Sequence, residues 1–558
     1  MANQRLELTW IGKGEDPVVE PRILLHDPSK DYGNPNTENM LIHGDNLLVL
    51  KALEQQFAGQ VKCIYIDPPY NTGEAFEHYD DNLEHSIWLR LMYARLRLLR
   101  NLLADDGFFC CQIDDSEGHY LKVLLDEVFG RNGYYQTTIY VRVRYPEKTL
   151  KQDMAFHKEI EQIHVYRKST SAKPILTTVD AGYEKFKYSI STDKTPDRVL
   201  ELGGKRVEVF NKGHYTITEE EGSKYGLKEI WASGTILDGN SSGRFFRDYL
   251  TGRYETDGYG VLYKVYGIGD DRYDFRFFTG PNREGATKGK YYQGVPLDKL
   301  ESGEMTREVP INGFIDLAAS FGNCRHEGGS EFRGGKKPEI LLQTLLTHFS
   351  NPGDLVLDSF LGSGTTAAVA QKMGRQYIGV ELGEHCYTLC KPRLDRVIDG
   401  EQTGISKVVD WHGGGGYKFY ELAPSLIEKD KYGNPVISDK YNPTMLIAAV
   451  VKLNGYFFAP DPDVFWKQGH SQDKSYIYVT TTYLDAKMLD GLAAEVSPME
   501  HLLICAPAFD TGLSMRYENI QVRKIPQSVL DKCEYGVNDY NLNIVDIPEL
   551  DEEDCEDA

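Results

Sequence analysis

The sequence predicts an α/β protein with a parallel sheet, interrupted by a β-rich insertion and followed by a small α/β C-terminal region. Short apolar runs alternate with helix-like segments from residue 39 to about residue 135, and this texture returns at about residue 331. Between these two segments, strand-like pieces alternate with loops rich in Gly, Lys and Asn. A chain of 558 residues is too long for one core, so several domains are expected.

The first α/β segment begins with a strand at residues 40–43 and a helix that Asp45 is placed to cap. A second buried strand ends at Asp67-Pro68-Pro69-Tyr70. The two prolines lack an N–H and have a fixed φ, so the chain must leave the sheet there. Asp67 and Tyr70 would then lie at the carboxyl end of a strand, where open α/β sheets bind ligands. An ordinary strand-to-loop turn is the alternative, and these four residues alone do not decide.

A long helix is expected at residues 86–103. Ile87 and several leucines form one face, the arginines occupy the opposite side, and Asp106-Gly107 should stop the helix. Residues 107–113 then form a buried strand and residues 117–129 a helix. Three strand–helix units in so short a segment predict a parallel sheet.

The second α/β segment carries a glycine-rich loop between a strand and a helix. Gly362, Gly364 and Ala367 give the pattern G-x-G-x-x-A, and Glu381 ends the next strand. Glycines let a ligand approach the backbone, and an acid in this place accepts hydrogen bonds from ribose hydroxyls. The elements expected around the loop are a helix at 340–349, a strand at 355–358, a helix at 367–373 and a strand at 376–381.

The net charge of −22 argues against a general attraction to nucleic acid. The charge is uneven, because residues 131–330 hold 30 Lys and Arg against 28 Asp and Glu, whereas the last residues form an acidic tail. The central segment also interleaves aromatic residues with arginines, as in Arg244-Phe245-Phe246-Arg247. Such a pattern suits base stacking and phosphate contacts, and it equally suits an irregular β-rich domain.

Cysteine usage and hydropathy indicate a cytoplasmic protein. The sequence contains no run of 18 apolar residues, so no membrane span is expected, and the first residues lack the apolar core of a signal peptide. The nine cysteines form no C-x-x-C pair, so reduced thiols are expected. Cys386 and Cys390 lie four residues apart beside His385. We favour packing cysteines over a zinc site there and expect no metal.

The glycine loop could belong to a nicotinamide or flavin enzyme, but Asp67-Pro68-Pro69-Tyr70 favours methylation of an exocyclic amine. The lone pair of such an amine is delocalised into its ring, so an enzyme must supply acceptors for the amino hydrogens. Asp67 and the Pro68 carbonyl can accept them, and Tyr70 can stack on a base swung out of the duplex. Cytosine C5 methylation would need a cysteine nucleophile, which usually follows a proline, and the chain has no Pro-Cys pair.

The motifs DPPYNTG, LDSFLGSGTT and FRGGKKPEIL, which begin at Asp67, Leu357 and Phe332, resemble those of the β-class amino-methyltransferases of DNA. The stretch from Asp67 through Phe129 is most similar to the Mod subunits of type III restriction–modification systems. The resemblance implies a Rossmann-like sheet that depends on S-adenosylmethionine, with an inserted target-recognition domain. It also implies adenine N6 as the target, because Asp67 occupies the first position of its motif.

The resemblance implies a role for each matching residue. Asp67, Pro68, Pro69 and Tyr70 would hold the target amine. Gly334-Gly335-Lys336 departs from the family pattern, so whether Lys336 or Lys337 makes the contact there stays open. The residues expected to hold or flank S-adenosylmethionine are Asp45, Phe332, Lys337, Pro338, Asp358 near the methionine end, Phe360, Gly362, Ser363, Gly364, Thr365 and Glu381.

The predicted organisation places the catalytic residues and the cofactor loop in two separated segments. The target-recognition domain would lie between them, and the role of the C-terminal domain is not predicted. The boundaries expected are an N-terminal extension at 1–38, the catalytic half at 39–135, target recognition at 136–325, the cofactor-binding half at 326–400, and a C-terminal domain with the acidic tail at 401–558.

The resemblance implies a site-specific DNA adenine-N6 methyltransferase that flips its target base out of double-stranded DNA. The chain has no G-x-x-x-x-G-K-[ST] loop, so a restriction partner would have to be a separate helicase–nuclease. A homodimer is expected from the same resemblance. The alternative activities are cytosine-N4 methylation, methylation of RNA or protein, and DNA recognition by an inactive subunit. Instead of a restriction system, the protein could belong to another phage-defence system or be a stand-alone methylase.

Overall fold

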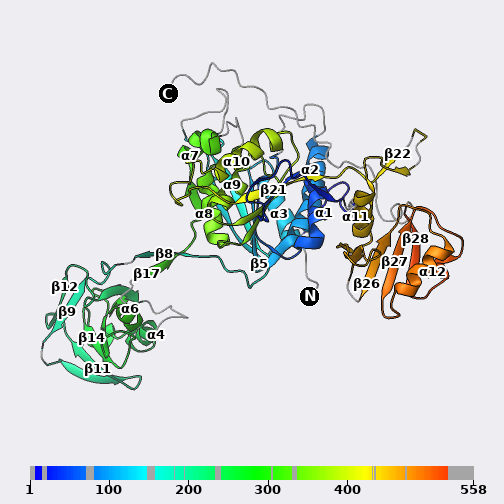
Figure 1. Ribbon diagram of the computed structural model, residues 1–558. Coiled ribbons are helices and arrows are strands. Elements are labelled where there is room, and N and C mark those ends of the chain that lie inside the picture. The colour runs from blue at the N-terminus through cyan, green and yellow to red at the C-terminus, as the bar shows by residue number, and fades with distance from the viewer. Residues whose placement is uncertain are drawn as a thin grey trace, which may run out of the picture. The chain divides into compact units, whose positions relative to one another are not determined.

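The structure is a computed structural model that falls into two compact units. Unit 1 comprises Met1–Ile175 with Asn312–Ala558, and unit 2 comprises Leu176–Ile311 (Figure 1). The residues described are 7–14, 20, 22–70, 81–146, 157–180, 182–193, 195–232, 241–302, 306–329, 336–429, 431–432, 435–471 and 474–525.

An 11-stranded sheet forms the core of unit 1, in the order β1-β21-β3-β20-β19-β4-β5-β7-β6-β18, with β2 paired to β21. The segment from β21 to β5 is parallel, which confirms the predicted α/β class. The strands are β1 (Leu24–His26), β2 (Tyr32–Gly33), β3 (Met40–His43), β4 (Val61–Ile66), β5 (Leu103–Ile113), β6 (Tyr135–Arg142), β7 (Ile160–Arg167), β18 (Phe314–Asp316), β19 (Leu355–Asp358), β20 (Gln376–Glu381) and β21 (Gly416–Leu422).

Helices cover both faces of this sheet (Figure 1). On one face, α1, α2 and α3 bury their leucines against alternate residues of the parallel strands, such as Ile64 and Phe109. On the other face, Phe349 of α8 packs against Phe108 with its ring tilted by 33° and the ring centroids 4.8 Å apart. The helices are α1 (Asn46–Phe57), α2 (Asp81–Leu102), α3 (Gly118–Phe129), α7 (Ala318–Asn323), α8 (Glu339–Phe349), α9 (Thr365–Lys372) and α10 (Lys391–Ile398).

Helix α2 ends within one residue of its predicted end at 103, but it begins earlier than predicted, at Asp81, and it differs on its polar side. It ends at Leu102, and β5 begins at Leu103, because Leu103 already pairs with Val61 of β4 before a register shift. The predicted stop at Asp106-Gly107 is therefore wrong. Arg95, expected on the polar side, is fully buried, and Ile87, expected on the apolar face, is 45% exposed.

Strands β6 and β7 join the main sheet, although the sequence placed them in the central segment. β7 is antiparallel to both β5 and β6, and β18 runs parallel to β6. Residues 135–167 therefore widen the sheet of unit 1. The compact unit 2, Leu176–Ile311, is shorter than the segment 136–325 expected for target recognition.

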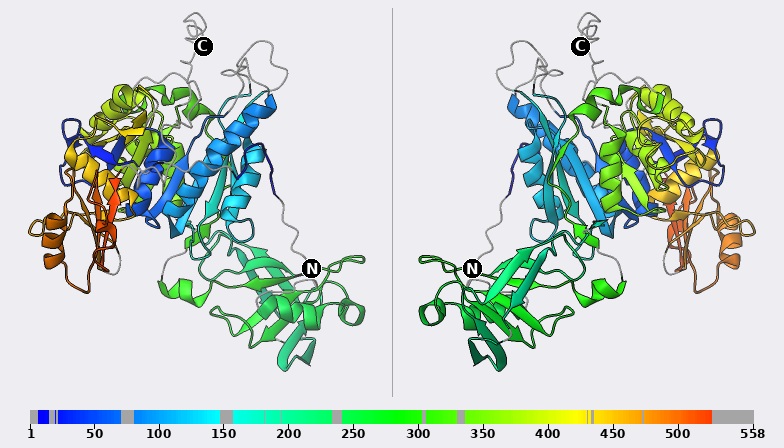
Figure 2. Two further views of the ribbon diagram at one scale, coloured as in Figure 1. Left: turned by 90° about the vertical axis from the view of Figure 1, so that its right-hand side faces the viewer. Right: turned by 90° about the vertical axis from the view of Figure 1, so that its left-hand side faces the viewer.

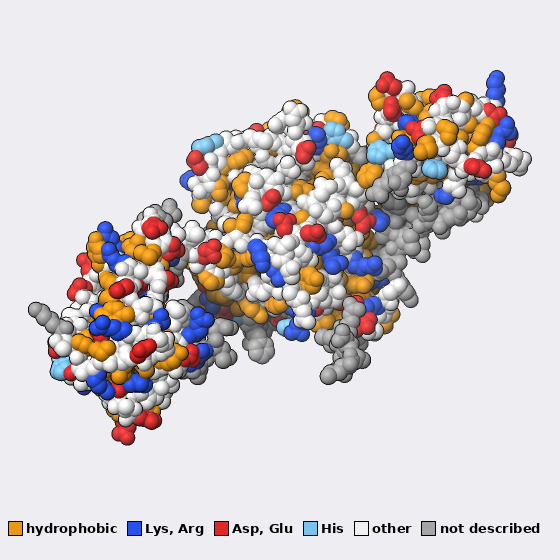
Figure 3. Space-filling model, turned by 90° about the horizontal axis from the view of Figure 1, so that it is seen from below, with side chains coloured by type: hydrophobic (Ala, Val, Ile, Leu, Met, Phe, Trp, Pro, Cys, Tyr) orange, Lys and Arg blue, Asp and Glu red, His pale blue; other side chains and the backbone are white. Residues whose placement is uncertain are grey.

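Unit 2 is built on a six-stranded antiparallel sheet in the order β10-β11-β14-β15-β16-β13. α4 and the adjoining η1 cover one face, and the two-stranded antiparallel sheet of β9 and β12 packs on the other, which confirms the predicted β-rich fold. Figure 3 shows basic, acidic and hydrophobic side chains mixed over its surface. Its elements are β8 (Thr177–Asp180), β9 (Tyr188–Thr192), β10 (Arg198–Leu202), β11 (Lys205–Phe210), β12 (Tyr215–Glu219), β13 (Lys228–Ala232), α4 (Ser241–Phe245), η1 (Phe246–Leu250), α5 (Tyr254–Asp257), β14 (Leu262–Tyr266), β15 (Phe275–Thr279), β16 (Gly289–Gln293), α6 (Leu297–Ser302) and β17 (Thr306–Val309).

The C-terminal part of unit 1 forms a small α/β layer structure, shown in orange in Figure 2. α11 and α12 pack against alternate residues of its strands, and so on opposite faces of a five-stranded sheet. The acidic tail lies outside the described residues. No helix among those described is long and apolar enough to cross a membrane. The elements are β22 (Ile427–Lys429), β23 (Pro435–Ile437), α11 (Pro443–Leu453), β24 (Phe457–Phe458), β25 (Gly469–His470), β26 (Ser475–Val479), α12 (Ala486–Glu495), β27 (His501–Ala506) and β28 (Ile520–Lys524).

Candidate active site

Four parallel strands end at one edge of the main sheet and bring the predicted site residues together. The order β3-β20-β19-β4 makes them direct neighbours. Asp45 follows β3, Asp67 follows β4, and Asp358 and Glu381 end β19 and β20. Segments far apart in the sequence therefore share the edge where open α/β sheets bind their ligands.

The turn after β4 is held by two hydrogen bonds. The Tyr70 hydroxyl donates to Asp67 Oδ1 at 2.7 Å, and the Trp88 indole N–H on α2 donates to the Pro69 carbonyl at 2.8 Å. The two prolines cannot donate to a neighbouring strand, so the backbone turns away from the sheet here. Asp67 and Tyr70 are both half-buried at this turn.

Two charged residues complete the surroundings of Asp67. Lys337, which lies just before α8, places its Nζ 2.8 Å from Asp67 Oδ2 and 3.7 Å from Glu161 Oε2. Glu161 comes from β7, places its Oε2 2.8 Å from the Tyr70 hydroxyl oxygen and accepts from the Gln112 amide. Lys337 is predicted from the sequence, whereas Glu161 and Gln112 are not. No alternation in β7 marks the face of Glu161, because Ile163, His164, Val165 and Tyr166 are all buried.

The charges of this cluster shift one another's protonation. Burial raises the pKa of Asp67, and Glu161 raises it further, while Lys337 and Tyr70 oppose the rise. Burial lowers the pKa of Lys337, but the attraction of Asp67 and Glu161 is stronger, so the pKa of Lys337 is raised overall. Burial also raises the pKa of the Tyr70 hydroxyl, which stays protonated. The ammonium group of Lys337 therefore stays charged beside two carboxyl groups.

The glycine loop after β19 has an open backbone. Gly362 and Gly364 adopt φ values of 56° and 80°, in the left-handed region that favours glycine. A Cβ on Gly362 would meet only the Phe360 carbonyl, at 3.9 Å, so a ligand has room there. Glu381 Oε2 accepts from the Gly362 N–H at 2.7 Å, and its Oε1 pairs with His385 Nε2 at 2.9 Å. Glu381 thus fixes the loop from the next strand.

Asp358 and Ser359 are buried polar groups behind this loop. Asp358 accepts hydrogen bonds from the Thr366 hydroxyl at 2.5 Å and from the Phe360 N–H at 2.9 Å. Burial outweighs these bonds and raises the pKa of Asp358 to about 7. The Ser359 hydroxyl is buried without a hydrogen-bond partner among the described residues. A polar or cationic ligand at this place would satisfy both groups.

Asp45 caps α1, as predicted, by accepting from the Leu48 N–H at 3.1 Å. The buried Arg95 of α2 lies 3.5 Å from Asp45 Oδ2 and donates to Asn46 Oδ1 at 2.5 Å. The Asn46 amide in turn donates to the Ser359 carbonyl at 2.7 Å. A buried arginine, which the helical pattern placed on the polar side, therefore connects the turn after β3 to the start of the glycine loop.

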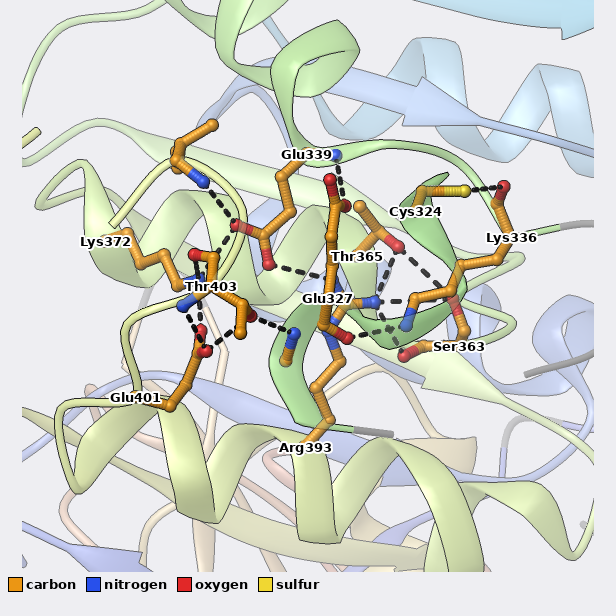
Figure 4. Close-up of polar contacts among 12 residues, drawn as sticks. Cys324, Glu327, Lys336, Glu339, Ser363, Thr365, Lys372, Arg393, Glu401 and Thr403 are labelled. Atoms are coloured by element: carbon orange, nitrogen blue, oxygen red, sulfur yellow. Dashed lines mark hydrogen bonds and ion pairs between the residues drawn. The ribbon is translucent and has the colours of Figure 1, made fainter. Parts of the chain in front are cut away.

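A buried ionic cluster lies beneath the glycine loop (Figure 4). The fully buried Glu339 carboxylate pairs with Arg393 Nη2 and with Lys372 Nζ, each at 2.8 Å. Lys372 also pairs with Glu401. The pKa of Glu339 is lowered, because Arg393 and Lys372 outweigh its burial. Two carboxylates and two cations leave this cluster balanced in charge.

The cluster also determines where the predicted residues Ser363 and Thr365 point (Figure 4). Arg393 Nη1 donates to Thr365 Oγ1 at 2.7 Å and to the Ser363 carbonyl at 3.2 Å. Thr365 Oγ1 donates to the Lys337 carbonyl at 3.2 Å. The Thr365 hydroxyl is thus turned inward, and it connects the glycine loop to the residue that pairs with Asp67.

The structure describes some of the remaining predicted residues but not all of them. Pro338 is buried at the N-cap of α8. Lys336 donates to the carbonyls of Arg325 and Glu327, at 3.1 and 2.6 Å, so Lys337 is the lysine that reaches Asp67. Phe332 and the neighbouring Gly334 and Gly335 lie outside the described residues.

No group of His, Cys, Asp and Glu suited to a metal ion occurs in the part of the chain that the structure describes. The sequence raised a zinc site at His385, Cys386 and Cys390 as the less favoured alternative. His385 instead pairs with Glu381, both cysteines are buried, and Cys390 Sγ lies 2.8 Å from the Gly362 carbonyl. Burial raises the pKa of both thiols.

Comparison with known proteins agrees with the motifs. A family model for DNA methylases matches residues 61–392. The chain is 34% identical over 423 residues to the probable type III restriction-modification enzyme HindVI Mod subunit of Haemophilus influenzae, covering 70% of this chain and 55% of that protein. It is 27% identical to the StyLTI Mod subunit of Salmonella typhimurium, covering 69% and 58%, and 25% identical to the EcoPI Mod subunit of Escherichia phage P1, covering 73% and 66%.

The chain thus spans little more than half the length of the first two of these relatives. The family match covers both the Asp-Pro-Pro-Tyr turn and the glycine loop, together with everything between them. The resemblance predicted from the motifs is confirmed, and the chain belongs to the DNA methylase family.

Proposed function

We propose that this chain transfers a methyl group from S-adenosylmethionine to the N6 amine of adenine in double-stranded DNA, after flipping the base out. One observation carries the proposal. β4, which ends in Asp67, is hydrogen-bonded beside β19, which ends in the glycine loop. An acceptor for amine hydrogens and a backbone suited to a nucleoside ligand therefore stand on neighbouring strands.

The residues at the glycine loop fit S-adenosylmethionine. The open backbone at Gly362 leaves room for close approach, and the buried Ser359 hydroxyl offers an unused polar group. Asp358 and Glu381 supply acceptors and negative charge for a ligand that carries an ammonium and a sulfonium group. When bound, this cofactor would supply an electrophilic methyl group.

The turn after β4 would act on the target base. Asp67 and the Pro68 carbonyl would accept the two amino hydrogens, which turns the nitrogen lone pair toward the methyl group. The Tyr70 ring would stack on the flipped base, and its hydroxyl already anchors it to Asp67. The Trp88 bond to Pro69 would keep the turn rigid while the base enters.

Adenine is favoured over cytosine N4 by family association, since Asp67 begins the motif. Either amine could donate to this carboxylate, so cytosine N4 is the second candidate. Lys337 pairs with Asp67 next to an intact glycine loop, which argues against an inactive recognition subunit.

The role proposed for the part of the segment 136–325 that forms unit 2, Leu176–Ile311, is DNA recognition. Within unit 2, Trp231 is 64% exposed and Lys290 Nζ lies 4.7 Å from the centre of its ring, a pairing that suits stacking and phosphate contact. The names of the relatives support a role as the Mod subunit of a type III restriction–modification enzyme. From the motif resemblance we infer a cytoplasmic homodimer that works with a separate helicase–nuclease.

The test is transfer of tritium from labelled S-adenosylmethionine to unmethylated plasmid DNA, followed by hydrolysis and separation of the nucleosides. We expect label on N6-methyladenine, and none with Asp67→Ala. Label on N4-methylcytosine would replace the adenine assignment. Cofactor binding without transfer to DNA, RNA or protein would support the inactive subunit instead. Capture of a large ATPase from the native host would establish the restriction partner.

A further inference from the structure

The Tyr70 hydroxyl bridges two carboxyl groups at the proposed target site. Its oxygen lies 2.7 Å from Asp67 Oδ1 and 2.8 Å from Glu161 Oε2. A hydroxyl has one hydrogen, so it can donate to only one of the two carboxylates at a time. The other carboxylate can then give a proton to the hydroxyl oxygen across a distance that suits a hydrogen bond.

The charges around this bridge leave room for one proton. Asp67 and Glu161 are two carboxyl groups, and Lys337 is the cation that contacts both, at 2.8 and 3.7 Å. Tyr65 faces both carboxyl groups and donates to Gln112, the same amide that donates to Glu161, and Asp358 on β19 also interacts electrostatically with Asp67. Two half-buried carboxylates beside one ammonium carry a surplus negative charge, so a proton released by the amine finds an acceptor here. The ionic cluster of Glu339, by contrast, is balanced.

We propose that Glu161 takes up, through the Tyr70 hydroxyl, the proton that the methylated amine loses to Asp67. Once the amine nitrogen has bonded to the methyl carbon, it is positively charged and holds one hydrogen too many. An N–H bond breaks and its proton goes to Asp67 Oδ1. That proton then passes to the Tyr70 oxygen as the Tyr70 hydrogen passes to Glu161 Oε2.

This relay leaves Asp67 ionised and Glu161 neutral. The ion pair between Lys337 and Asp67 is restored, while the proton rests on the carboxyl group farther from Lys337. Glu161 does not contact the amine and receives the proton through Tyr70, so it is a positioning residue that holds a proton. It supplies what Asp67 lacks on its own, because Asp67 must be free of its proton before the next amine can donate to it.

The test is Glu161→Gln, with initial rates of label transfer to unmethylated plasmid DNA measured from about pH 4 to about pH 9. We expect kcat to fall by roughly 10- to 100-fold with little change in the KM for S-adenosylmethionine. The acid limb of the kcat profile should also move to lower pH, because removing Glu161 removes a negative charge that raises the pKa of Asp67. Tyr70→Phe, combined with Glu161→Gln, should add little further loss, since both break one path.

Glu159→Gln is the matched control, because Glu159 lies two residues away and faces Arg142 at 3.5 Å. It should leave the rate and its pH profile unchanged. If Glu161→Gln does not fold, Glu161→Asp keeps a carboxyl group and should retain the position of the acid limb with a reduced kcat. An unchanged kcat, or a loss with an unmoved acid limb, would overturn the inference.

The inference rests on the proposed function, and the two can fail separately. If the unaltered protein transfers no label to DNA, the proposed function fails. If it transfers label while Glu161→Gln behaves like Glu159→Gln, only the role of Glu161 fails.

Discussion

The two halves of the candidate site bury charge in opposite ways. Beneath the glycine loop, Glu339 and Glu401 are paired with Arg393 and Lys372. Around Asp67, two carboxyl groups contact one ammonium group among the described residues, that of Lys337. A cluster with equal numbers of positive and negative groups stabilises the conformation of the residues around it. A cluster with a surplus carboxylate can also accept a proton. The difference separates a part built to stay fixed from a part able to react.

The largest effect on activity should come from Asp67→Ala, which removes one of the two carboxyl groups beside Lys337. We expect the methylation rate to fall by at least roughly 10²-fold, because the acceptor for the amine hydrogens is lost. Affinity for S-adenosylmethionine should stay near that of the unaltered protein, since Glu381 and the glycine loop are untouched. Tritium transfer and equilibrium dialysis measure the two quantities. Equal losses in both would mean that the halves do not act separately.

A substitution in the ionic cluster around Glu339 should lower the stability of the protein. Arg393→Met leaves Glu339 buried with one partner fewer, which should lower the free energy of unfolding by about 3–5 kcal/mol. Urea unfolding measures the change.

Lys391→Met on the same helix is the control. Lys391 pairs with Asp395 at 2.8 Å one turn along α10, in a half-buried position. Such pairs contribute about 0.5 kcal/mol or less. Similar losses for both variants would contradict the view that the Glu339 cluster holds the loop.

The contribution of Asp358 to stability should depend on pH, as expected for a buried carboxyl group that is ionised without a cationic partner. Burial raises its pKa from 3.8 to about 7 in the folded protein, so ionised Asp358 destabilises the fold above that value. The penalty fades as the pH falls from about 7 toward 4, by up to about 1.4 kcal/mol per pH unit. Asp358→Asn should therefore be more stable than the unaltered protein at high pH and lose this advantage in acid. A gap that stays constant with pH, in unfolding curves without cofactor, would refute it.

The smallest effect should come from the support of the proline turn. Trp88→Phe removes the indole N–H that donates to the Pro69 carbonyl, at a cost of about 1 kcal/mol. We expect a several-fold rise in the KM for DNA with an unchanged KM for cofactor. Ordinary initial-rate kinetics with plasmid DNA test this, and a change confined to the cofactor would place Trp88 in the other half.

The sequence predicted the features that depend on local chemistry. The prolines after Asp67 and the glycines at 362 and 364 impose backbone constraints that any fold must respect, and the strands beside them lie where expected. Asp45 could be recognised as a helix cap from its neighbours alone. The family motifs added which of these turns belong together, although they lie nearly three hundred residues apart.

Features that depend on distant partners could not be predicted. Glu161 faces Asp67 because β7 returns antiparallel beside β5, and no pattern within β7 reports that pairing. Arg95 is buried because its partners, Asn46 and Asp45, lie on another segment of the chain. The end of α2 at Leu102 follows from the pairing of Leu103 with Val61, which overrides the stop signal at Asp106-Gly107.

The position of β19 and β20 between β3 and β4 also affects how the chain is made. β4 ends at Ile66, but the strand that completes its other side begins only at Leu355. At about 5–20 residues per second, a ribosome needs roughly tens of seconds to cover that interval. Until then the nascent sheet has an empty slot, with bare strand edges that other chains can pair with. We expect residues 1–175 expressed alone to aggregate, and the growing chain to need chaperone cover until its second half emerges.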